Sequence, residues 1–320
     1  MDEIELTGTG KRTSRVGLGC GPLDAGVSMR DSTKLVEAAI ELGIRHFDVA
    51  PPYGLGLAEK VLGEVLSSRW DSFTIATKVG IGRPGRPHAL AIARKIMRPL
   101  AKVMPRLRRM MRLAVHSTNA RRRFRFTAAE VQLSFTDSRR FLRTDCVDIL
   151  MLHEPRPEDV TPELIHMFER LVTQGEVKLV GSGTGDTFEK LVKFGKVSQY
   201  RWDPMTQVTR RSDEQHIQHG ALRYGLAALP SAMKARPKQT QELSALLGCD
   251  LTDPANLPAM LATMALATDQ RSILLVSSND ISRLRSCVRG INWSVARGEQ
   301  PGIERALQRL LCAPIAAFAN

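Results

Sequence analysis

The chain has 320 residues, of which 43% are hydrophobic and 25% are charged. These fractions match ordinary globular usage and exclude a disordered or collagen-like chain. Lysine and arginine number 46 against 33 aspartates and glutamates, so the formal net charge is +13. The surplus is local, because residues 79–129 contain 14 basic residues and no acidic one. The rest of the chain is close to neutral.

No apolar run reaches the roughly 18 to 20 residues that a membrane-spanning helix needs. The acidic opening MDEIEL lacks the basic and apolar regions of a signal peptide. Scattered cysteines without a paired motif favour reduced thiols over disulfides or a zinc site. We therefore expect a cytoplasmic protein without a spanning helix. The cysteines are Cys20, Cys146, Cys249, Cys287 and Cys312.

Short apolar or β-branched runs alternate with segments of helical period along the chain. A hairpin is expected first, over residues 4–15, with Gly8, Gly10 and Lys11 at its turn. Eight strands are then predicted at residues 16–18, 46–49, 73–77, 147–152, 177–180, 206–209, 226–229 and 273–276. Helical patterns lie between several of them, at residues 32–42, 57–66, 127–142, 162–174 and 186–194.

Strict alternation of strands and helices predicts a parallel sheet, and eight such units predict a closed barrel. We therefore expect an α/β fold, a single (β/α)8 TIM barrel over residues 1–320, with an N-terminal β-hairpin. Residues 79–129 are expected to form a basic helical insertion after the third strand. An open doubly wound sheet is the alternative. In a barrel, chemistry belongs at the carboxyl ends of the strands, where the loops converge.

Four polar residues fall at predicted strand ends. Asp48 ends the second strand and Tyr53 lies in the following loop, while Lys78 and His153 end the third and fourth strands. A phenol has a pKa near 10 in water and needs a nearby cation to work as an acid or base near neutrality. Lys78 would supply that cation, and Asp48 would keep the buried lysine charged. His153 would orient a carbonyl oxygen by a hydrogen bond.

The segments around these residues resemble the aldo-keto reductase family. Residues 43–54 read GIRHFDVAPPYG and continue into EKVLG at 59–63, which is similar to the family's aspartate and tyrosine signature. Further support comes from IATK at 75–78, LRTDCVDILMLH at 142–153 and GEVKLVGS at 175–182. In order and spacing, the resemblance covers residues 16–182 well and the remainder more loosely.

The resemblance implies an NAD(P)H-dependent oxidoreductase that reduces an aldehyde or ketone, or oxidises the corresponding alcohol or sugar. Tyr53 would be the general acid/base, tuned by Lys78 and Asp48, with His153 positioning the substrate. The implied cofactor is NADP, with NAD left open, extended over the barrel mouth. A guanidinium would suit a 2′-phosphate. The implied cofactor contacts are Ser182, Gly183, Thr184, Gln207, Ser278 and Arg283. The family's stacking tyrosine after the seventh strand has no counterpart in residues 227–231.

The basic insertion has apolar residues every three or four positions over residues 90–115, with arginines and lysines between them. This pattern predicts one or two amphipathic helices, started or kinked by Pro99 and Pro105. Three interpretations stay open: a plain solvated surface, a lid that attracts an anionic substrate, and contact with an anionic membrane. Nucleic acid is disfavoured, because few aromatic residues accompany the arginines.

Two further interpretations complete the prediction. The alternative function is a non-catalytic barrel that senses the cofactor or serves as a scaffold, including one apposed to a membrane through residues 79–129. His216 and His219 lie near Asp213 and resemble a metal cluster, but we interpret them as a polar helix face and expect no metal. The sequence predicts neither the particular carbonyl nor the oligomeric state.

Overall fold

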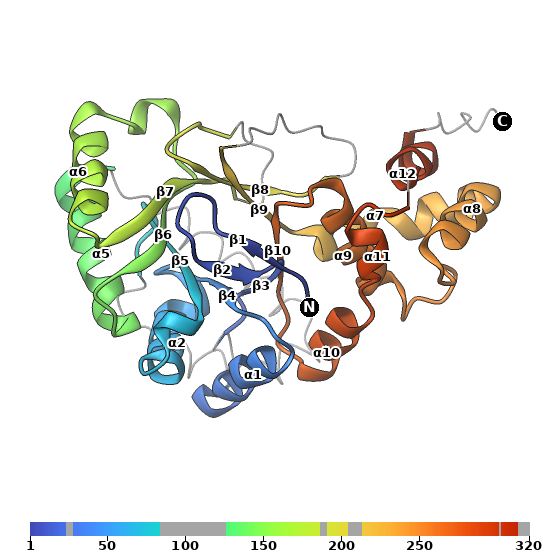
Figure 1. Cartoon of the computed structure of the whole chain (residues 1–320), viewed down its shortest axis with the longest axis horizontal. Coiled ribbons are helices and arrows are strands. Elements are labelled where there is room, and N and C mark those ends of the chain that lie inside the picture. Colours follow the sequence, from blue (N-terminus) through green and yellow to red (C-terminus); the bar gives the residue numbers. More distant parts are fainter. Residues whose placement is uncertain (24–27, 84–125, 186–190, 204–212, 301, 313–320) are drawn as a thin grey trace, which may run out of the picture.

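The computed structural model describes residues 1–23, 28–83, 126–185, 191–203, 213–300 and 302–312. Eight parallel strands close into a barrel in the order β10-β3-β4-β5-β6-β7-β8-β9 (Figure 1). The last strand pairs with the first, which confirms the predicted barrel and excludes an open sheet. The strands are β3 (Val16–Gly19), β4 (His46–Asp48), β5 (Thr74–Val79), β6 (Val147–His153), β7 (Val177–Gly183), β8 (Val197–Arg201), β9 (Gln215–His219) and β10 (Ile273–Val276).

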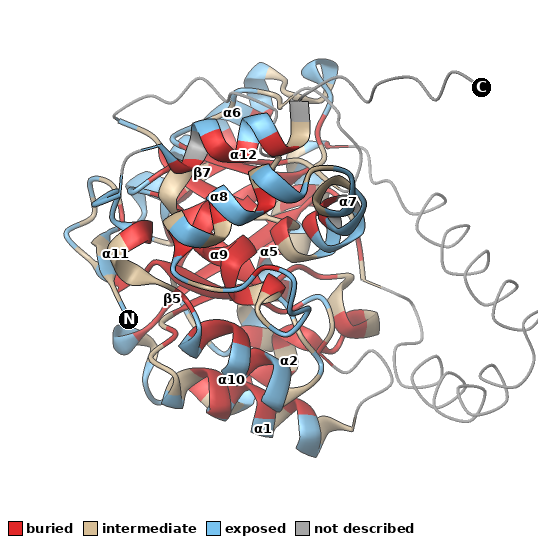
Figure 2. Cartoon of the chain, turned by 90° about the vertical axis from the view of Figure 1, so that its right-hand side faces the viewer, coloured by how far each residue is buried: buried red, intermediate tan, exposed pale blue. Residues whose placement is uncertain are grey.

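Helices surround the barrel, with their buried faces inward and their exposed faces outward (Figure 2). In the first helix, Ser28 caps the N-terminus by accepting a hydrogen bond from the Asp31 backbone nitrogen, and an apolar stripe including Leu35 and Val36 is buried. None of the described helices is long and apolar enough to cross a membrane. They are α1 (Met29–Glu41), α2 (Ala58–Leu66), α5 (Ala128–Leu142), α6 (Pro162–Thr173), α7 (Ala221–Ala235), α8 (Pro237–Leu247), α9 (Leu257–Thr268), α10 (Ile281–Arg289), α11 (Trp293–Ala296) and α12 (Ile303–Cys312), with short turns η1 (Tyr53–Gly56), η2 (Trp70–Ser72) and η3 (Pro157–Asp159).

The predicted positions of the sixth and seventh strands are wrong. Residues 206–209 lie outside the described residues, and the sixth barrel strand is β8. Residues 226–229 lie within α7, and the seventh strand is β9. Of the helix predicted at 186–194, residues 191–194 form no helix, and the others lie outside the described residues.

His216 and His219 therefore lie on a strand rather than on a helix face. His216 is buried and its Nδ1 lies 2.8 Å from a carboxylate oxygen of Asp269. Within the described part of the chain, no group of histidine, cysteine and acidic residues is arranged to hold a metal ion.

Side chains fill the inside of the barrel in layers. Successive side chains of a strand point to opposite faces, so residues two positions apart both face inward. The inward-facing residues at successive levels in the middle of the barrel are apolar and are together called the apolar layer. The level beyond them lies at the carboxyl ends of the strands, where barrels carry their chemistry. The apolar layer consists of Ala76, Ile149, Met151, Leu179, Val197, Ile217, Ile273 and Leu275.

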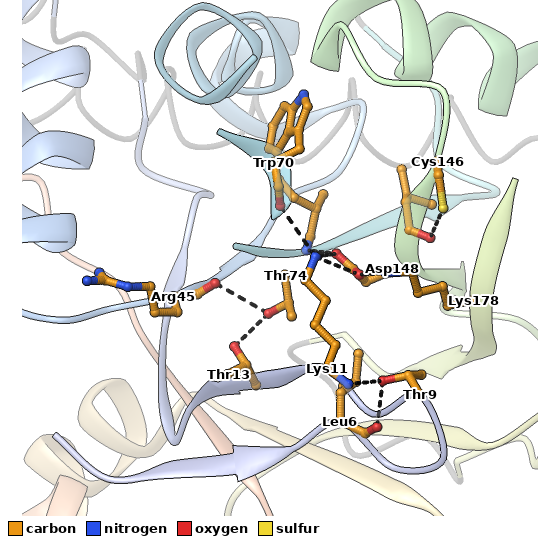
Figure 3. Close-up of polar contacts among 12 residues, drawn as sticks. Leu6, Thr9, Lys11, Thr13, Arg45, Trp70, Thr74, Cys146, Asp148 and Lys178 are labelled. Atoms are coloured by element: carbon orange, nitrogen blue, oxygen red, sulfur yellow. Dashed lines mark hydrogen bonds and ion pairs between the residues drawn. The ribbon is translucent and has the colours of Figure 1, made fainter. Parts of the chain in front are cut away.

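The predicted hairpin forms and closes the amino-terminal end of the barrel. Strands β1 (Glu3–Glu5) and β2 (Arg12–Ser14) pair antiparallel, and Leu6 beyond β1 is fully buried with the apolar layer. From the turn, Lys11 reaches Asp148 at the start of β6, with Nζ 3.1 Å from the carboxylate (Figure 3). Because this end is closed, the open end is the one that carries the predicted site.

The basic insertion is described only at its two ends. Residues 79–83 continue from β5, and residues 126–129 lead into α5. The amphipathic helix predicted over 90–115, and with it most of the excess charge, lies outside the described residues. The three interpretations of this segment therefore stay predictions.

Candidate active site

Beyond the apolar layer, the inward-facing residues become polar. Asp48 ends β4, Lys78 stands near the end of β5, His153 ends β6, Gln199 lies on β8 and His219 ends β9. The first four are buried, and His219 is half-buried. Strand ends far apart in the sequence thus meet at one rim, and three of the four predicted catalytic residues are among them.

Asp48 holds the ammonium group of Lys78 inside the barrel. The Lys78 Nζ lies 2.6 and 2.7 Å from the two carboxylate oxygens and 3.4 Å from the Val49 carbonyl oxygen. Gln199 donates its side-chain amide to the same carboxylate at 2.8 Å. Asp48 and Lys78 are 2% and 1% exposed. Each charge therefore needs the other, because an unpaired buried ion costs several kcal/mol.

Tyr53 reaches the rim from the tight turn η1. Gly54, Leu55 and Gly56 have φ values of 59°, 59° and 93°, which are all left-handed. Such a conformation costs a residue with a side chain about 1 to 3 kcal/mol, so the surroundings must enforce it. Space also requires glycine at position 54, where a Cβ would lie 1.9 Å from the Leu23 carbonyl oxygen. The turn therefore fixes the direction in which Tyr53 points.

Tyr53 lies beside both Lys78 and His153. Its ring stands edge-on to the His153 ring, with centroids 5.9 Å apart and planes at 87°. The Nζ of Lys78 lies 4.9 Å from the centroid of the tyrosine ring. The structure thus brings together all four residues that the sequence singles out for catalysis.

The environment sets the protonation states of these groups. Burial raises the pKa of the Tyr53 phenol, and the Lys78 cation opposes this rise only in part. Burial alone would lower the pKa of Lys78, but Asp48 and Tyr53 together outweigh burial and the pKa is raised. Burial and the charge of Lys78 hold the pKa of His153 well below its usual range. At neutral pH the rim therefore presents a protonated phenol, an ammonium ion and a neutral imidazole.

The predicted cofactor residues on β7 lie at the same rim. The Ser182 hydroxyl donates to the Val192 carbonyl, so this side chain is engaged away from the barrel interior. Gly183 faces inward, where a Cβ would lie only 2.8 Å from the Oε1 of Gln199. The Thr184 backbone nitrogen donates to the Gln199 carbonyl at 2.9 Å, and its own carbonyl accepts from the Nε2 of His219 at 3.2 Å.

Ser278 and Arg283 lie together at the start of α10, with Asp280 between them. The Ser278 hydroxyl donates to the Asp280 carbonyl at 2.9 Å, and the Asp280 carboxylate caps the helix by accepting from the Arg283 backbone nitrogen at 3.0 Å. The Arg283 side chain is exposed. The residue predicted to contact a cofactor phosphate thus lies in the first turn of a helix whose N-terminal cap is an acid. Gln207 lies outside the described residues.

Two residues at the mouth escape the sequence prediction. Gln199 is on the true sixth strand, whereas the prediction sought an amide at Gln207. The alternation in VSQY over residues 197–200 is the signal that would have found it. His219 ends the true seventh strand, so an aromatic ring does stand there, and residues 227–231 are the wrong place to seek one.

The mouth offers what a planar, polar nicotinamide ring needs. Gly183 leaves one wall bare of a side chain, and Gln199 and Thr184 place amide groups beside it. The Nδ1 of His153 is buried and has no hydrogen-bond partner among the described residues. Buried polar atoms are usually satisfied, so such an atom is consistent with a ligand or water in the mouth.

A closed barrel with a buried lysine–aspartate pair, a tyrosine and a neutral histidine at one rim is of the class that handles protons at a carbonyl or alcohol. The model of the Aldo/keto reductase family matches residues 15–204, more than half of the chain. The chain therefore belongs to the aldo/keto reductase family.

Curated relatives and solved structures agree with this assignment. The chain is 29% identical over 239 residues to the D-threo-aldose 1-dehydrogenase of a Pseudomonas species, covering 72% of this chain and 62% of the relative. It is 33% identical over 150 residues to the pyridoxal 4-dehydrogenase of Microbacterium luteolum, covering 46% and 41%. The chain thus spans less than two thirds of the length of either relative. A Bacillus halodurans aldo-keto reductase in its holo form shares the fold, with a TM-score of 0.66, 17% identity and 99% coverage of both chains.

Proposed function

We propose that the protein is an NAD(P)H-dependent oxidoreductase that interconverts a carbonyl group and an alcohol. The observation that carries this proposal is the position of Lys78, which Asp48 holds 2.6 Å away at the open end of the barrel, with Nζ 4.9 Å from the Tyr53 ring centroid. A protonated phenol is a general acid, and a cation beside it stabilises the phenolate that remains. Relatives named as aldose and galactose dehydrogenases support the same reaction class.

The residues divide the proton chemistry as follows. A nicotinamide held at the mouth by Gly183, Thr184 and Gln199 would supply the hydride. The Tyr53 hydroxyl donates its proton to the carbonyl oxygen, and the electron pair of the broken O–H bond stays on the phenolate, which Lys78 stabilises. His153 is neutral and donates a hydrogen bond that orients the carbonyl oxygen. In the oxidative direction the Tyr53 phenolate accepts the proton of the alcohol.

We propose NADP as the cofactor, with NAD as the second possibility. Arg283 would contact the 2′-phosphate of NADP, and Asp280 beside it opposes a second negative charge. Gln199 and His219 join the proposed cofactor contacts because they stand at the mouth. The contacts proposed from the sequence are Ser182, Gly183, Thr184, Gln207, Ser278 and Arg283.

We propose a small carbonyl compound or sugar as the substrate, since the chain is similar to a D-threo-aldose 1-dehydrogenase. A preference for anionic substrates, and contact with an anionic membrane, both depend on residues 84–125 and stay predictions. We also propose that the protein works in the cytoplasm. Free thiols at four described cysteines support a reducing compartment. They are Cys20, Cys146, Cys249 and Cys287.

A cofactor titration followed by a turnover assay tests the proposal. NADPH and NADH are titrated into the purified protein, and oxidation of the better ligand is then followed with a panel of aldoses, aldehydes and ketones. We expect binding of at least one cofactor and turnover with at least one carbonyl. Binding without any turnover would overturn the enzymatic proposal in favour of a cofactor-sensing barrel. No binding of either cofactor would point to a scaffold.

Sedimentation with phosphatidylserine vesicles tests the membrane contact separately. The full chain is compared with a variant that lacks residues 90–125. Loss of sedimentation in the variant is expected if the basic insertion is the contact, because its cations would bind the anionic headgroups. Equal sedimentation of the two proteins would reject that role.

A further inference from the structure

Arg83 is the last described residue before the undescribed part of the insertion, and its side chain turns back toward the active site. Its Nε donates to the Gly56 carbonyl at 3.1 Å, and its Nη2 forms an ion pair with Glu59. The guanidinium carbon lies 3.9 Å from the ring centroid of Phe141. The Arg83 side chain is only 15% exposed, so its charge is held by protein contacts rather than by solvent.

Glu59 connects Arg83 to the strand of Lys78. This glutamate lies on α2 and is 1% exposed. Its Oε1 accepts a hydrogen bond from the Thr77 hydroxyl at 2.8 Å, and Thr77 directly precedes Lys78 on β5. Burial raises the pKa of Glu59, and Arg83 and Thr77 oppose that rise. Without Arg83, the carboxylate would be left buried without its cation, which favours its protonation.

The contacts of Arg83 therefore reach the turn that carries Tyr53 and, through Glu59, the strand that carries Lys78. Gly56 closes the turn that begins at Tyr53, and that turn runs through three consecutive left-handed residues. A strained turn persists only where its surroundings over-determine it. Arg83 supplies such a constraint from outside the turn, while Glu59 fixes the same guanidinium to the strand of Lys78.

We propose that Arg83, held by Glu59, is a positioning residue that sets the separation of the Tyr53 phenol and the Lys78 ammonium group. It touches neither the substrate nor the reacting atoms. The inference rests on the proposed function, because it assigns a role within the same site. It predicts that loss of Arg83 changes the acidity of Tyr53, which a merely stabilising contact would not do.

The test compares Arg83→Met with a matched variant at the opposite end of the barrel, Arg45→Met. Arg45 also donates to backbone carbonyls, those of Ile40 and Ile44, each at 3.0 Å. Its guanidinium carbon also lies near an aromatic ring, 5.6 Å from the Phe73 centroid. Both substitutions thus remove a guanidinium that binds backbone and an aromatic ring, but only one is connected to Tyr53.

Two readouts are measured on each variant. The first is steady-state turnover, in which Arg83→Met should lower kcat about 10- to 100-fold, as expected for a misplacement of about 1 Å, with KM and NADPH affinity changed less than about threefold. The second needs no turnover. The pKa of Tyr53 is followed by NMR of ¹³C-labelled tyrosine in the free protein, with the signal assigned from Tyr53→Phe. It should rise, because the phenolate loses part of its stabilisation by Lys78.

The controls separate positioning from folding. Arg45→Met should lower the melting temperature while leaving kcat and the Tyr53 pKa unchanged. Arg83→Lys should recover only part of kcat, because a lysine ammonium lacks the planar set of donors of a guanidinium. If Arg83→Met fails to fold, Glu59→Gln takes its place, with the same direction of change in the Tyr53 pKa. An unchanged Tyr53 pKa in the folded variant overturns the inference. A wild-type protein without turnover instead overturns the proposed function, and the NMR titration still decides the role of Arg83.

Discussion

The barrel holds a lysine–aspartate ion pair at each end, and the neighbours of the two pairs differ. At the mouth, Lys78 and Asp48 lie 2.6 Å apart beside Tyr53. At the base, Lys11 of the hairpin lies 3.1 Å from Asp148 (Figure 3). Both carboxylates are buried. Similar pairs thus stand at the two ends of one set of strands.

The Asp148 carboxylate at the base pairs only with groups that hold the fold together, among the described residues. Asp148 also accepts from the Nζ of Lys178 at 3.0 Å and from the Ile75 backbone nitrogen at 2.9 Å. These bonds hold the hairpin against the strands. Both lysine cations, Lys11 and Lys178, pair with the carboxylate of Asp148. At the mouth, Lys78 pairs with Asp48 and also faces a phenol. A buried ion pair thus becomes chemically useful where a third titratable group reaches its cation.

The largest expected difference is between Lys78→Met and Lys11→Met. Loss of Lys78 removes the cation that stabilises the Tyr53 phenolate and leaves Asp48 buried without it, so kcat should fall about 1000-fold. Loss of Lys11 leaves Lys178 on Asp148, so it should cost about 1 kcal/mol of unfolding free energy with kcat unchanged. Turnover assays and urea unfolding check both. An equal loss of kcat in the two variants would show that the two ion pairs do not differ in their role in turnover.

The base also holds a buried histidine, His46, which makes stability depend on pH. Burial lowers the pKa of His46 at the base from 6.5 to about 4, and its Nδ1 lies 2.8 Å from the Thr74 hydroxyl. The folded pKa lies below the unfolded one, so the full contribution to stability is present above pH 6.5 and is lost as the pH falls through 4. The loss should approach about 3 kcal/mol.

Urea unfolding of wild type and His46→Asn at several pH values between 7 and 4 measures this contribution. The variant should be less stable at neutral pH and should lose less stability on acidification, because it lacks the buried imidazole. Curves that run parallel for the two proteins would show that His46 does not carry this pH dependence.

A smaller effect is expected at the edge of the mouth, where Asp280 stands near Arg283. Asp280→Asn keeps a side chain that can cap α10 but removes the negative charge, so the affinity for NADPH relative to NADH should rise about fivefold. Titration of both cofactors gives the ratio. Glu163→Gln in the first turn of α6, on the opposite side of the barrel, is the control and should leave the ratio unchanged. A ratio that does not move in Asp280→Asn would place the 2′-phosphate elsewhere.

Six of the eight barrel strands could be predicted from the sequence, because they are short apolar runs bounded by polar turns. The strand β9 reads QHIQH and is too polar to be predicted as a strand from hydropathy. Its Gln215 side chain donates to the Arg271 carbonyl at 3.2 Å, and the His216 Nδ1 lies 2.8 Å from Asp269, so these polar side chains have partners inside the fold. The segment LAAL at 226–229 is apolar enough for a strand, yet its alanines and leucines favour the helix α7 in which it lies.

The four predicted catalytic residues could be found because each ends or closely follows a strand. Gln199 was missed only because its strand was misplaced. The contact of Arg83 with Glu59 could not be predicted, since it joins two residues 24 positions apart across a helix and a strand. Local spacing carries no signal for such a contact, which depends on how α2 packs beside β5.

The role of Tyr53 as proton donor is tested most directly by the turnover of Tyr53→Phe. The variant keeps the ring that packs between Lys78 and His153 and lacks only the hydroxyl. We predict an unchanged melting temperature, cofactor affinity within about twofold of wild type, and a kcat lowered at least about 1000-fold. Turnover at the wild-type rate in the folded, cofactor-binding variant would contradict the proposed mechanism.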